Sequence, residues 1–201
     1  KTIIFDTETT GLKADAKIIQ FSAYKFIVTK TGGLDKVEYF DSYCNPQEKL
    51  TKKITEITNI TDEMLENAPT EEILAPTIFE FLESADCLLA YNASFDLSKL
   101  EAMAIRTKQY FTREDFPYFD VLDLARDFVP SKEVEDHKLE TIFHYFFPEK
   151  SFQFHNSLDD VKATSLVFCK LLRLYINHKK EENKRSIHLE RGNLFINPRQ
   201  Q

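Results

Sequence analysis

The chain has 201 residues, 42% of them hydrophobic, and a formal net charge of −7 at neutral pH. This length fits one domain with a single core, to which 18 phenylalanines and 8 tyrosines can contribute. With four glycines and no low-complexity sequence the chain does not resemble a disordered protein, and no apolar run reaches the roughly 18 residues that span a bilayer. We therefore expect a soluble globular domain without a membrane segment.

The first half of the chain predicts an antiparallel meander. Apolar runs predict strands over residues 2–6, 18–29 and 37–46, with a hairpin turn at residues 29–33 between the second and the third. Thr61 is then expected to cap a short helix, and a longer helix begins at Thr70, with a bend or a late start imposed by Pro76.

The second half alternates strands and helices. A buried strand is predicted over residues 86–92, followed by a helix that begins near Ser94 and a short strand over residues 118–122. Further helices are expected over residues 122–128, 138–147 and 158–176. Three strands followed by this alternation predict an α/β fold in which a mixed sheet carries helices on its faces.

The cysteines and the distribution of charge suggest where the domain ends and in which compartment it works. Cys44, Cys87 and Cys169 are widely spaced and no signal peptide precedes them, which favours reduced thiols and an intracellular, cytoplasmic location. Residues 177–201 hold six Lys and Arg against three Asp and Glu, which leaves 20 − 30 = −10 for residues 1–176. We place a domain at residues 1–176 and a basic extension at residues 177–201, either a solvated helix end or tail, or an arm for docking or nucleic acid.

Carboxylates follow the first predicted strand and a later one. Asp6 and Glu8 are two residues apart, so they project from the same face if the strand continues through Thr7. Asp96 falls in the first turn of a helix, close to Asn92 at the end of a strand, where sites of α/β folds tend to form. Taken singly, these acids fit solvated strand ends and helix-dipole partners equally well.

A histidine and another acid stand before the last predicted helix. His155 precedes Asp160 by five residues, and each alone also fits a structural role, as a hydrogen-bonding imidazole and as an acid at a helix N-terminus. The remaining histidines lack metal-ligand spacing and are expected at the surface or in structural contacts.

Together these segments resemble the three motifs of the DEDDh exonucleases, which include the proofreading subunit and domains of bacterial replicative polymerases, oligoribonuclease and ribonuclease T. "FDTETTGL" is similar to the first motif, "NASFD" to the second and "HNSLDD" to the third. The resemblance covers about residues 1–176 and implies a ribonuclease H-like fold, a mixed five-stranded sheet that begins with an antiparallel meander of three strands. It departs modestly at Ser157, where many members have Ala, and at Tyr91, where His is frequent.

The resemblance also implies roles for particular residues. The implied catalytic set is Asp6, Glu8, Asp96, Asp160 and His155, in which the four carboxylates bind metal and the histidine is the general base. Supporting roles next to the terminal nucleotide and along the strand path would fall to Thr7, Thr9, Leu12, Asn92 and Phe95. Leu12 is the implied apolar wedge, although Thr9 and Leu12 fit turn and packing roles equally well.

The chemistry explains why such residues would gather. Carboxylates about 4 Å apart repel by roughly 4 kcal/mol per pair at an effective dielectric of 20, so a group of four calls for divalent cations. Ligands that are all oxygen atoms suit Mg²⁺ or Mn²⁺ better than zinc, and two such ions can bind one phosphodiester. An imidazole with an ordinary pKa of about 6.5 can accept a proton from water at neutral pH.

The resulting hypothesis is a 3′–5′ exonuclease that releases nucleoside 5′-monophosphates from nucleic-acid 3′ ends. A net negative chain is an unusual partner for nucleic acid unless its acids surround cations, so we expect short or frayed 3′ ends, or tethering by a larger assembly such as a DNA polymerase or helicase. The similarity to polymerase-associated members favours DNA over RNA and a task in proofreading or repair. Lys1 directly precedes the first strand, which fits both a segment of a longer polypeptide and a trimmed chain.

Other functions remain as alternatives. An exoribonuclease of the same family would use the same residues on RNA, and a nucleic-acid-binding or polymerase-tethered module would keep the fold with little turnover. A phosphatase of the haloacid dehalogenase type shares the pattern of "FDTET" and "LDD". In that phosphatase pattern the position of Glu8 is an aspartate, and neither Asp96 nor His155 has a role.

Overall fold

The computed structural model describes residues 1–150 and 152–193, with side chains described as far as Glu182. Within this range the strands form one five-stranded sheet in the order β3-β2-β1-β4-β5. β2 pairs antiparallel with β1 and β3, whereas β4 runs parallel to β1, and β5 runs parallel to β4. The predicted mixed sheet with an initial antiparallel meander is thereby confirmed. The strands are β1 (Thr2–Thr9), β2 (Ile18–Val28), β3 (Leu34–Tyr43), β4 (Cys87–Ala90) and β5 (Tyr118–Asp120).

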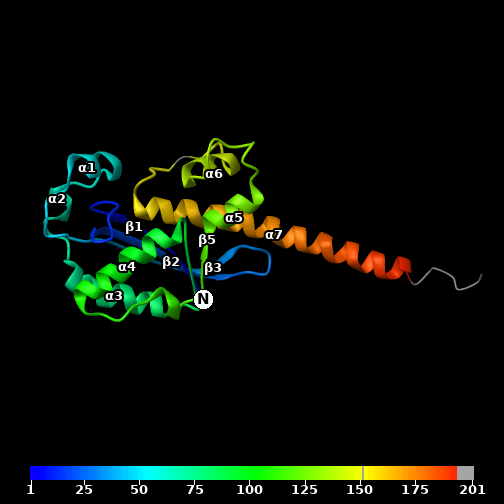
Figure 1. The fold of residues 1–201 in the computed structure, drawn as a ribbon, viewed down its shortest axis with the longest axis horizontal. Coiled ribbons are helices and arrows are strands. Elements are labelled where there is room, and N and C mark those ends of the chain that lie inside the picture. The colour runs from blue at the N-terminus through cyan, green and yellow to red at the C-terminus, as the bar shows by residue number, and fades with distance from the viewer. Residues whose placement is uncertain (151, 194–201) are drawn as a thin grey trace, which may run out of the picture.

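Helices cover both faces of the sheet (Figure 1). Side chains alternate along β1, so Ile3 and Phe5 pack in a core with α3 and α4, while Ile4 packs on the opposite face with α5, α6 and α7. The described helices are α1 (Lys52–Thr58), α2 (Asp62–Leu65), α3 (Glu71–Glu83), α4 (Ala93–Thr107), the short 3₁₀ helix η1 (Arg113–Asp115), α5 (Val121–Phe128), α6 (Leu139–Phe146) and α7 (Ser157–Asn193).

Several predicted boundaries were wrong for identifiable reasons. The third strand lies at Leu34–Tyr43 rather than at 37–46, and the strand predicted to reach residue 122 stops at Asp120. α3 begins at Glu71 and contains Pro76, so Pro76 does not delay the helix, although its missing N–H removes one intrahelical hydrogen bond. The prediction missed α1, whose N-terminus is capped by the Thr51 hydroxyl.

The last helix is longer than predicted. The sequence places its end at residue 176, but α7 continues to Asn193 and extends away from the rest of the domain in Figure 1. Its inner residues belong to the core as far as Leu171, and the side chains of residues 177–182 are exposed. The proposed boundary at residue 176 therefore lies inside a continuous helix. No helix in the described part of the chain is long and apolar enough to cross a bilayer.

Candidate active site

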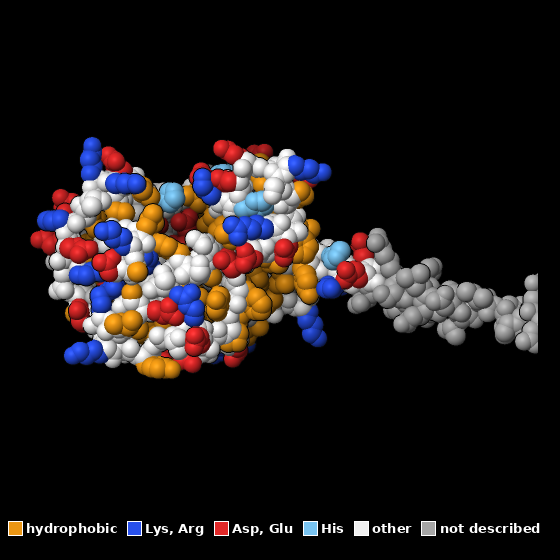
Figure 2. Space-filling view, viewed as in Figure 1, with side chains coloured by type: hydrophobic (Ala, Val, Ile, Leu, Met, Phe, Trp, Pro, Cys, Tyr) orange, Lys and Arg blue, Asp and Glu red, His pale blue; other side chains and the backbone are white. Residues whose placement is uncertain are grey.

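A cavity of about 910 Å³ opens where β1 and β4 end. Figure 2 shows a hollow on this side of the molecule, with acidic side chains at its bottom and a histidine at its rim. Because β1 and β4 are parallel, their carboxyl ends and the segments that follow them meet at one edge of the sheet. All ten residues that the sequence predicts for a site line this cavity: Asp6, Thr7, Glu8, Thr9, Leu12, Asn92, Phe95, Asp96, His155 and Asp160.

Three of the carboxylates form a compact group. Asp6 and Glu8 project from β1, and Asp160 projects from the first turn of α7. One oxygen of each lies within 4.8 Å of the others, and no other group of three potential metal ligands is found among the described side chains. Residues about 150 positions apart in sequence are thus brought to one point by the contact between α7 and β1.

Asp96 reaches the same cavity from α4 and is held by β1. Its side chain is 3% exposed, and its Oδ1 accepts hydrogen bonds from the backbone N–H and the hydroxyl of Thr7, at 2.9 and 2.7 Å. Thr7 lies between Asp6 and Glu8 and is itself buried. The threonine of the first motif therefore fixes the carboxylate of the second, and the other Asp96 oxygen makes no bond to Thr7.

Burial raises the pKa of all four carboxylates, and for Asp6, Glu8 and Asp160 the charges of neighbouring carboxylates add to this effect. Burial, followed by the charges of Asp96, Asp160 and Glu8, raises the pKa of Asp6 well above its ordinary value. Burial is also the main reason that the pKa of Glu8 rises to about 8. It raises the pKa of Asp96 and that of Asp160 to about 7, against the opposing hydrogen bonds from Thr7 and from the His155 backbone. A site with this many desolvated carboxylates favours a bound proton or a cation.

The ligand atoms suit a divalent metal ion. Asp160 Oδ1 is buried without a hydrogen-bond partner and is the only such side-chain atom in the described part of the chain. A buried oxygen in this condition normally has a partner, because its desolvation costs about 1–3 kcal/mol. Together with the neighbouring carboxylates of Asp6 and Glu8 it offers the all-oxygen donor set of a hard cation.

His155 stands at the rim of the cavity on a constrained backbone. Its side chain is exposed, and its φ of 64° lies in the left-handed region, which residues other than glycine seldom adopt. The backbone N–H of His155 donates to Asp160 Oδ2 at 3.1 Å. This bond places the histidine next to Asp160 while leaving its imidazole outside the cluster of carboxylates.

The N-terminus of α7 is anchored to β2 below the carboxylates. Ser157 is fully buried, its hydroxyl lies 2.6 Å from that of Ser22, and its backbone N–H donates to Gln20 Oε1 at 3.3 Å. In the sheet, Ser22 pairs with Asp6 and Gln20 pairs with Glu8. The departure from the usual alanine at residue 157 thus adds a hydrogen bond that positions Asp160 relative to β1.

Asp120 is a positioning residue that the sequence analysis missed. Its Oδ1 accepts from the backbone N–H groups of Asn92 and Leu122, each at 2.9 Å, and its Oδ2 accepts from Ala93 at 3.0 Å. It therefore caps both α5 and the start of α4, the helix that carries Asp96. An aspartate between a strand and a helical pattern is an N-cap signal. The sequence pattern instead predicts a strand through residue 122, which places Asp120 inside the strand and not at the start of a helix.

The walls of the cavity contain further residues that sequence reasoning did not assign. Ile54 and Ile57 of α1 line it beside the predicted Leu12, which is 85% exposed. Positively charged side chains also reach it from α1, α5 and the start of α6: Lys53, Arg126 and Lys138. Apolar and cationic walls around an acidic floor can contact a base and its phosphates separately.

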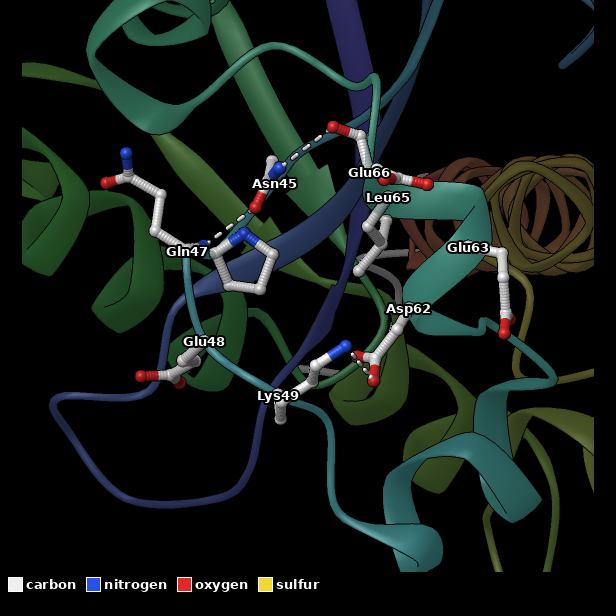
Figure 3. A pocket seen from close by; sticks show the side chains of 9 residues that line it. Asn45, Gln47, Glu48, Lys49, Asp62, Glu63, Leu65 and Glu66 are labelled. Carbon is white, nitrogen blue, oxygen red and sulfur yellow. Dashed lines mark hydrogen bonds and ion pairs between the residues drawn. The ribbon is translucent and has the colours of Figure 1, made fainter.

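A second, smaller hollow of about 410 Å³ lies between the end of β3 and α2 (Figure 3). Lys49 pairs with Asp62 there at 3.2 Å, and Asn45 Nδ2 donates to the Glu66 carbonyl at 3.3 Å. In Figure 3 the carboxylate of Glu63 points away from that of Asp62. Its acids do not converge, so this hollow lacks the arrangement found in the larger cavity.

Comparison with known sequences identifies the family. The family model described as exonuclease (RNase T) matches residues 3–168. The PolC-type DNA polymerase III of Caldanaerobacter subterraneus subsp. tengcongensis is 33% identical over 171 residues, and that of Bacillus subtilis strain 168 is 32% identical over 173 residues. Each alignment covers 85% of this chain but 11% of the relative, so the chain spans about a tenth of these relatives.

Solved structures have the same fold. The nuclease domain of 3′hExo, a DEDDh family member bound to rAMP, superimposes with a TM-score of 0.71 at 17% identity, covering 86% of this chain and 91% of that one. E. coli exonuclease I in complex with a dT13 oligonucleotide gives 0.69 at 19% identity, covering 85% of this chain and 40% of that one. With the family model matching most of its length, the chain belongs to the exonuclease (RNase T) family.

Proposed function

We propose that this chain hydrolyses the terminal phosphodiester at the 3′ end of single-stranded or frayed DNA and releases nucleoside 5′-monophosphates. The convergence of Asp6, Glu8 and Asp160 within 4.8 Å, beside Asp96 and His155 in one cavity, carries this proposal. This cavity lies at the carboxyl ends of the parallel strands β1 and β4, which is the usual position for a ligand in an α/β fold.

Asp6, Glu8, Asp96 and Asp160 would hold two divalent cations, Mg²⁺ or Mn²⁺. When bound, such cations supply charge stabilisation at a phosphodiester and make water a better nucleophile. The carboxylates would fix the positions of these cations, because they are attached to the sheet and to two helices whose N-termini are anchored. Thr7 and Asp120 support this arrangement without reaching the reacting atoms.

His155 would accept the proton of the attacking water. Its exposed position at the rim leaves the imidazole free to approach the water from the open side of the cavity. The backbone bond from His155 to Asp160 limits how far the residue can move from the metal-ligating group. General-base catalysis of this kind contributes about 10²–10⁴-fold to rate.

The walls would hold the terminal nucleotide. Leu12 and Phe95 offer apolar surfaces to its base, which suits an enzyme that accepts any base at the end. Lys53, Arg126 and Lys138 would contact phosphates of the strand, a source of affinity that the net charge of −7 does not suggest. Thr9 and Asn92 line the same path.

DNA is favoured as the substrate because the sequence relatives are DNA polymerases of the PolC type, although one solved neighbour carries rAMP. The same relatives support a proofreading task and attachment to a polymerase. A 2′-hydroxyl distinguishes the two nucleic acids, so an exoribonuclease is the competing function.

The test is degradation of 5′-labelled single-stranded DNA and RNA of matched sequence by the purified chain, with Mg²⁺, with Mn²⁺ and with EDTA. We expect a ladder that shortens from the 3′ end of DNA in the presence of either metal, and none with Asp6→Asn. Preferred shortening of RNA would overturn the choice of substrate. Intact oligonucleotides with both metals, or unchanged activity of Asp6→Asn, would overturn the mechanism.

A further inference from the structure

Lys99 is a buried lysine next to the candidate active site. It belongs to α4, three residues after Asp96, and is 1% exposed. Its ammonium donates hydrogen bonds to the backbone carbonyls of Leu12, at 3.2 Å, and of Lys13, and it lies 4.8 Å from the centre of the Phe95 ring. Its three contacts thus reach the segment after β1 and a side chain of the cavity wall.

This placement is energetically expensive. Lysine is almost never fully buried unless its charge is compensated, because moving an ammonium out of water costs several kcal/mol. Burial accordingly lowers the pKa of Lys99. Compensation comes from two carbonyls, an aromatic face and the nearby carboxylates of Asp15 and Asp96, where methionine would fill similar space without a charge. The use of a charged side chain here is therefore explained by the backbone that its ammonium binds, at Leu12 and Lys13.

The segment that Lys99 holds is a loop of residues 10–17 between β1 and β2. Its base is closed by hydrogen bonds between Thr10 and Lys17, at 2.9 and 3.1 Å. Its far side is bound by Arg106, which lies two helical turns after Lys99 and donates to the Asp15 carbonyl at 3.4 Å. Two cations on one face of α4 thereby fix the tip of the loop, on which Leu12 is exposed to the cavity.

We propose that Lys99 is a positioning residue that sets the gap between Leu12 and Phe95 and so determines how tightly the terminal base is held. This inference rests on the proposed function, because it assumes that a nucleotide enters between those two side chains. The carboxylates are anchored separately, by Thr7, Asp120 and Ser157. Loss of the Lys99 ammonium should therefore weaken binding of the terminal nucleotide more than it slows the chemical step.

The test is Lys99→Met, with steady-state kinetics on a single-stranded oligonucleotide and with binding of a nucleoside 5′-monophosphate in the presence of Mg²⁺. We expect KM for the oligonucleotide and Kd for the monophosphate to rise about ten- to hundredfold, while kcat falls less than about threefold. Faster hydrogen exchange in residues 10–17 should accompany the change. The double variant Leu12→Ala, Lys99→Met should lose less binding free energy for the monophosphate than the sum of the losses in the two single variants.

Lys25→Met is the matched control. Lys25 lies 4.7 Å from the ring of Phe81 and pairs with Glu38 at 2.6 Å, but it stands on β2 away from the cavity. The same substitution there should lower stability and leave KM unchanged. Lys99→Gln, which removes the charge, shortens the side chain and keeps two of the three N–H donors, takes the place of Lys99→Met if the latter does not fold.

A folded Lys99 variant with the KM, monophosphate Kd and loop exchange of the unmodified chain would overturn the inference and leave the proposed function intact. Failure of the unmodified chain to degrade any oligonucleotide would instead overturn the proposed function. In that case hydrogen exchange of residues 10–17 in Lys99→Met still decides whether the ammonium holds the loop.

Discussion

At the residue scale, the site separates the groups proposed to bind metal from the group proposed to accept a proton. Asp6, Glu8 and Asp160 share one small volume, whereas His155 joins them through its backbone and keeps its imidazole at the rim. The side chains proposed for these two tasks are thus linked through the hydrogen bond between His155 and Asp160. Their contributions can be measured independently.

His155→Ala should lower kcat by about 10²–10⁴-fold, because the general base is lost while the ligand oxygens stay in place. Stabilisation of the protein by Mg²⁺ should not change. Activity on a DNA oligonucleotide and metal-dependent thermal unfolding measure the two effects. His144→Ala is the control, since His144 is exposed on α6 and contacts the rings of Phe143 and Phe154. Equal losses in the two variants would contradict the assigned role.

The four motif carboxylates and His155 could be found from sequence because each lies in a short segment with a recognisable pattern. Lys99 could not, since a lysine inside a helical pattern is normally assigned to the surface. Asp120 gave a local signal, an acid between a strand and a helix, but its bonds to Asn92 and Ala93 join segments 27 and 28 residues apart. Tertiary contacts of this kind leave no mark in a single sequence.

At the element scale, the predicted strands and helices are most accurate where one face is apolar. β2 and α4 follow their predicted ranges closely because Ile, Phe and Leu recur with the period of the element, whereas β1 continues through Thr7 to Thr9, three residues beyond the predicted range of 2–6. α1 was missed because it contains Ile54, Thr55, Ile57 and Thr58, β-branched residues that favour strands. Its helical state depends on the Thr51 cap and on packing around Ile60 and Leu65.

Asp120→Ala should lower the free energy of unfolding by about 1–4 kcal/mol, because one change removes the caps of two helices and each cap is worth about 0.5–2 kcal/mol. Activity should fall as well, since the start of α4 positions Asp96. Urea denaturation measures the first effect. Thr51→Ala, which removes the cap of α1 alone, should cost about 1 kcal/mol. A loss no larger than that of the control would argue against the double cap.

At the scale of the whole molecule, the acidic site opposes folding until it is neutralised. Ordinary pKa values near 4 in the unfolded chain rise to about 7 for Asp96 and Asp160 and to about 8 for Glu8 in the folded chain without metal. Between about pH 4 and pH 8 the folded chain therefore binds more protons than the unfolded chain does. Its stability is greatest below about pH 4 on this account and falls as the pH rises towards 8.

Metal should reverse this trend. Without metal, we expect the thermal midpoint to fall between pH 5 and pH 8, by about 2–4 °C for each kcal/mol lost in a chain of this size. Added Mg²⁺ binds the deprotonated carboxylates and should raise the midpoint more at pH 8 than at pH 5. Asp160→Asn should flatten both dependences. A metal-free midpoint that rises with pH, or an equal Mg²⁺ effect at both values, would show that these groups are not linked to folding.

Removing residues 177–201 tests the predicted domain boundary. The described side chains of residues 177–182 are exposed, so truncation after residue 176 should change the unfolding free energy by less than about 1 kcal/mol and kcat/KM on a short oligonucleotide by less than about twofold. Leu171→Ala, in the buried part of the same helix, should cost about 2–5 kcal/mol. A weaker, less salt-dependent affinity after truncation would instead identify the extension as a nucleic-acid-binding arm.

α7 is a single helix of 37 residues, which at about 1.5 Å per residue makes a rod of about 55 Å. Asp160 stands in the first turn of this rod, and the opposite end projects from the domain. The buried residues of the same helix, as far as Leu171, pack in the core between these two ends. A force on the projecting end is therefore resisted by that packing before it reaches Asp160.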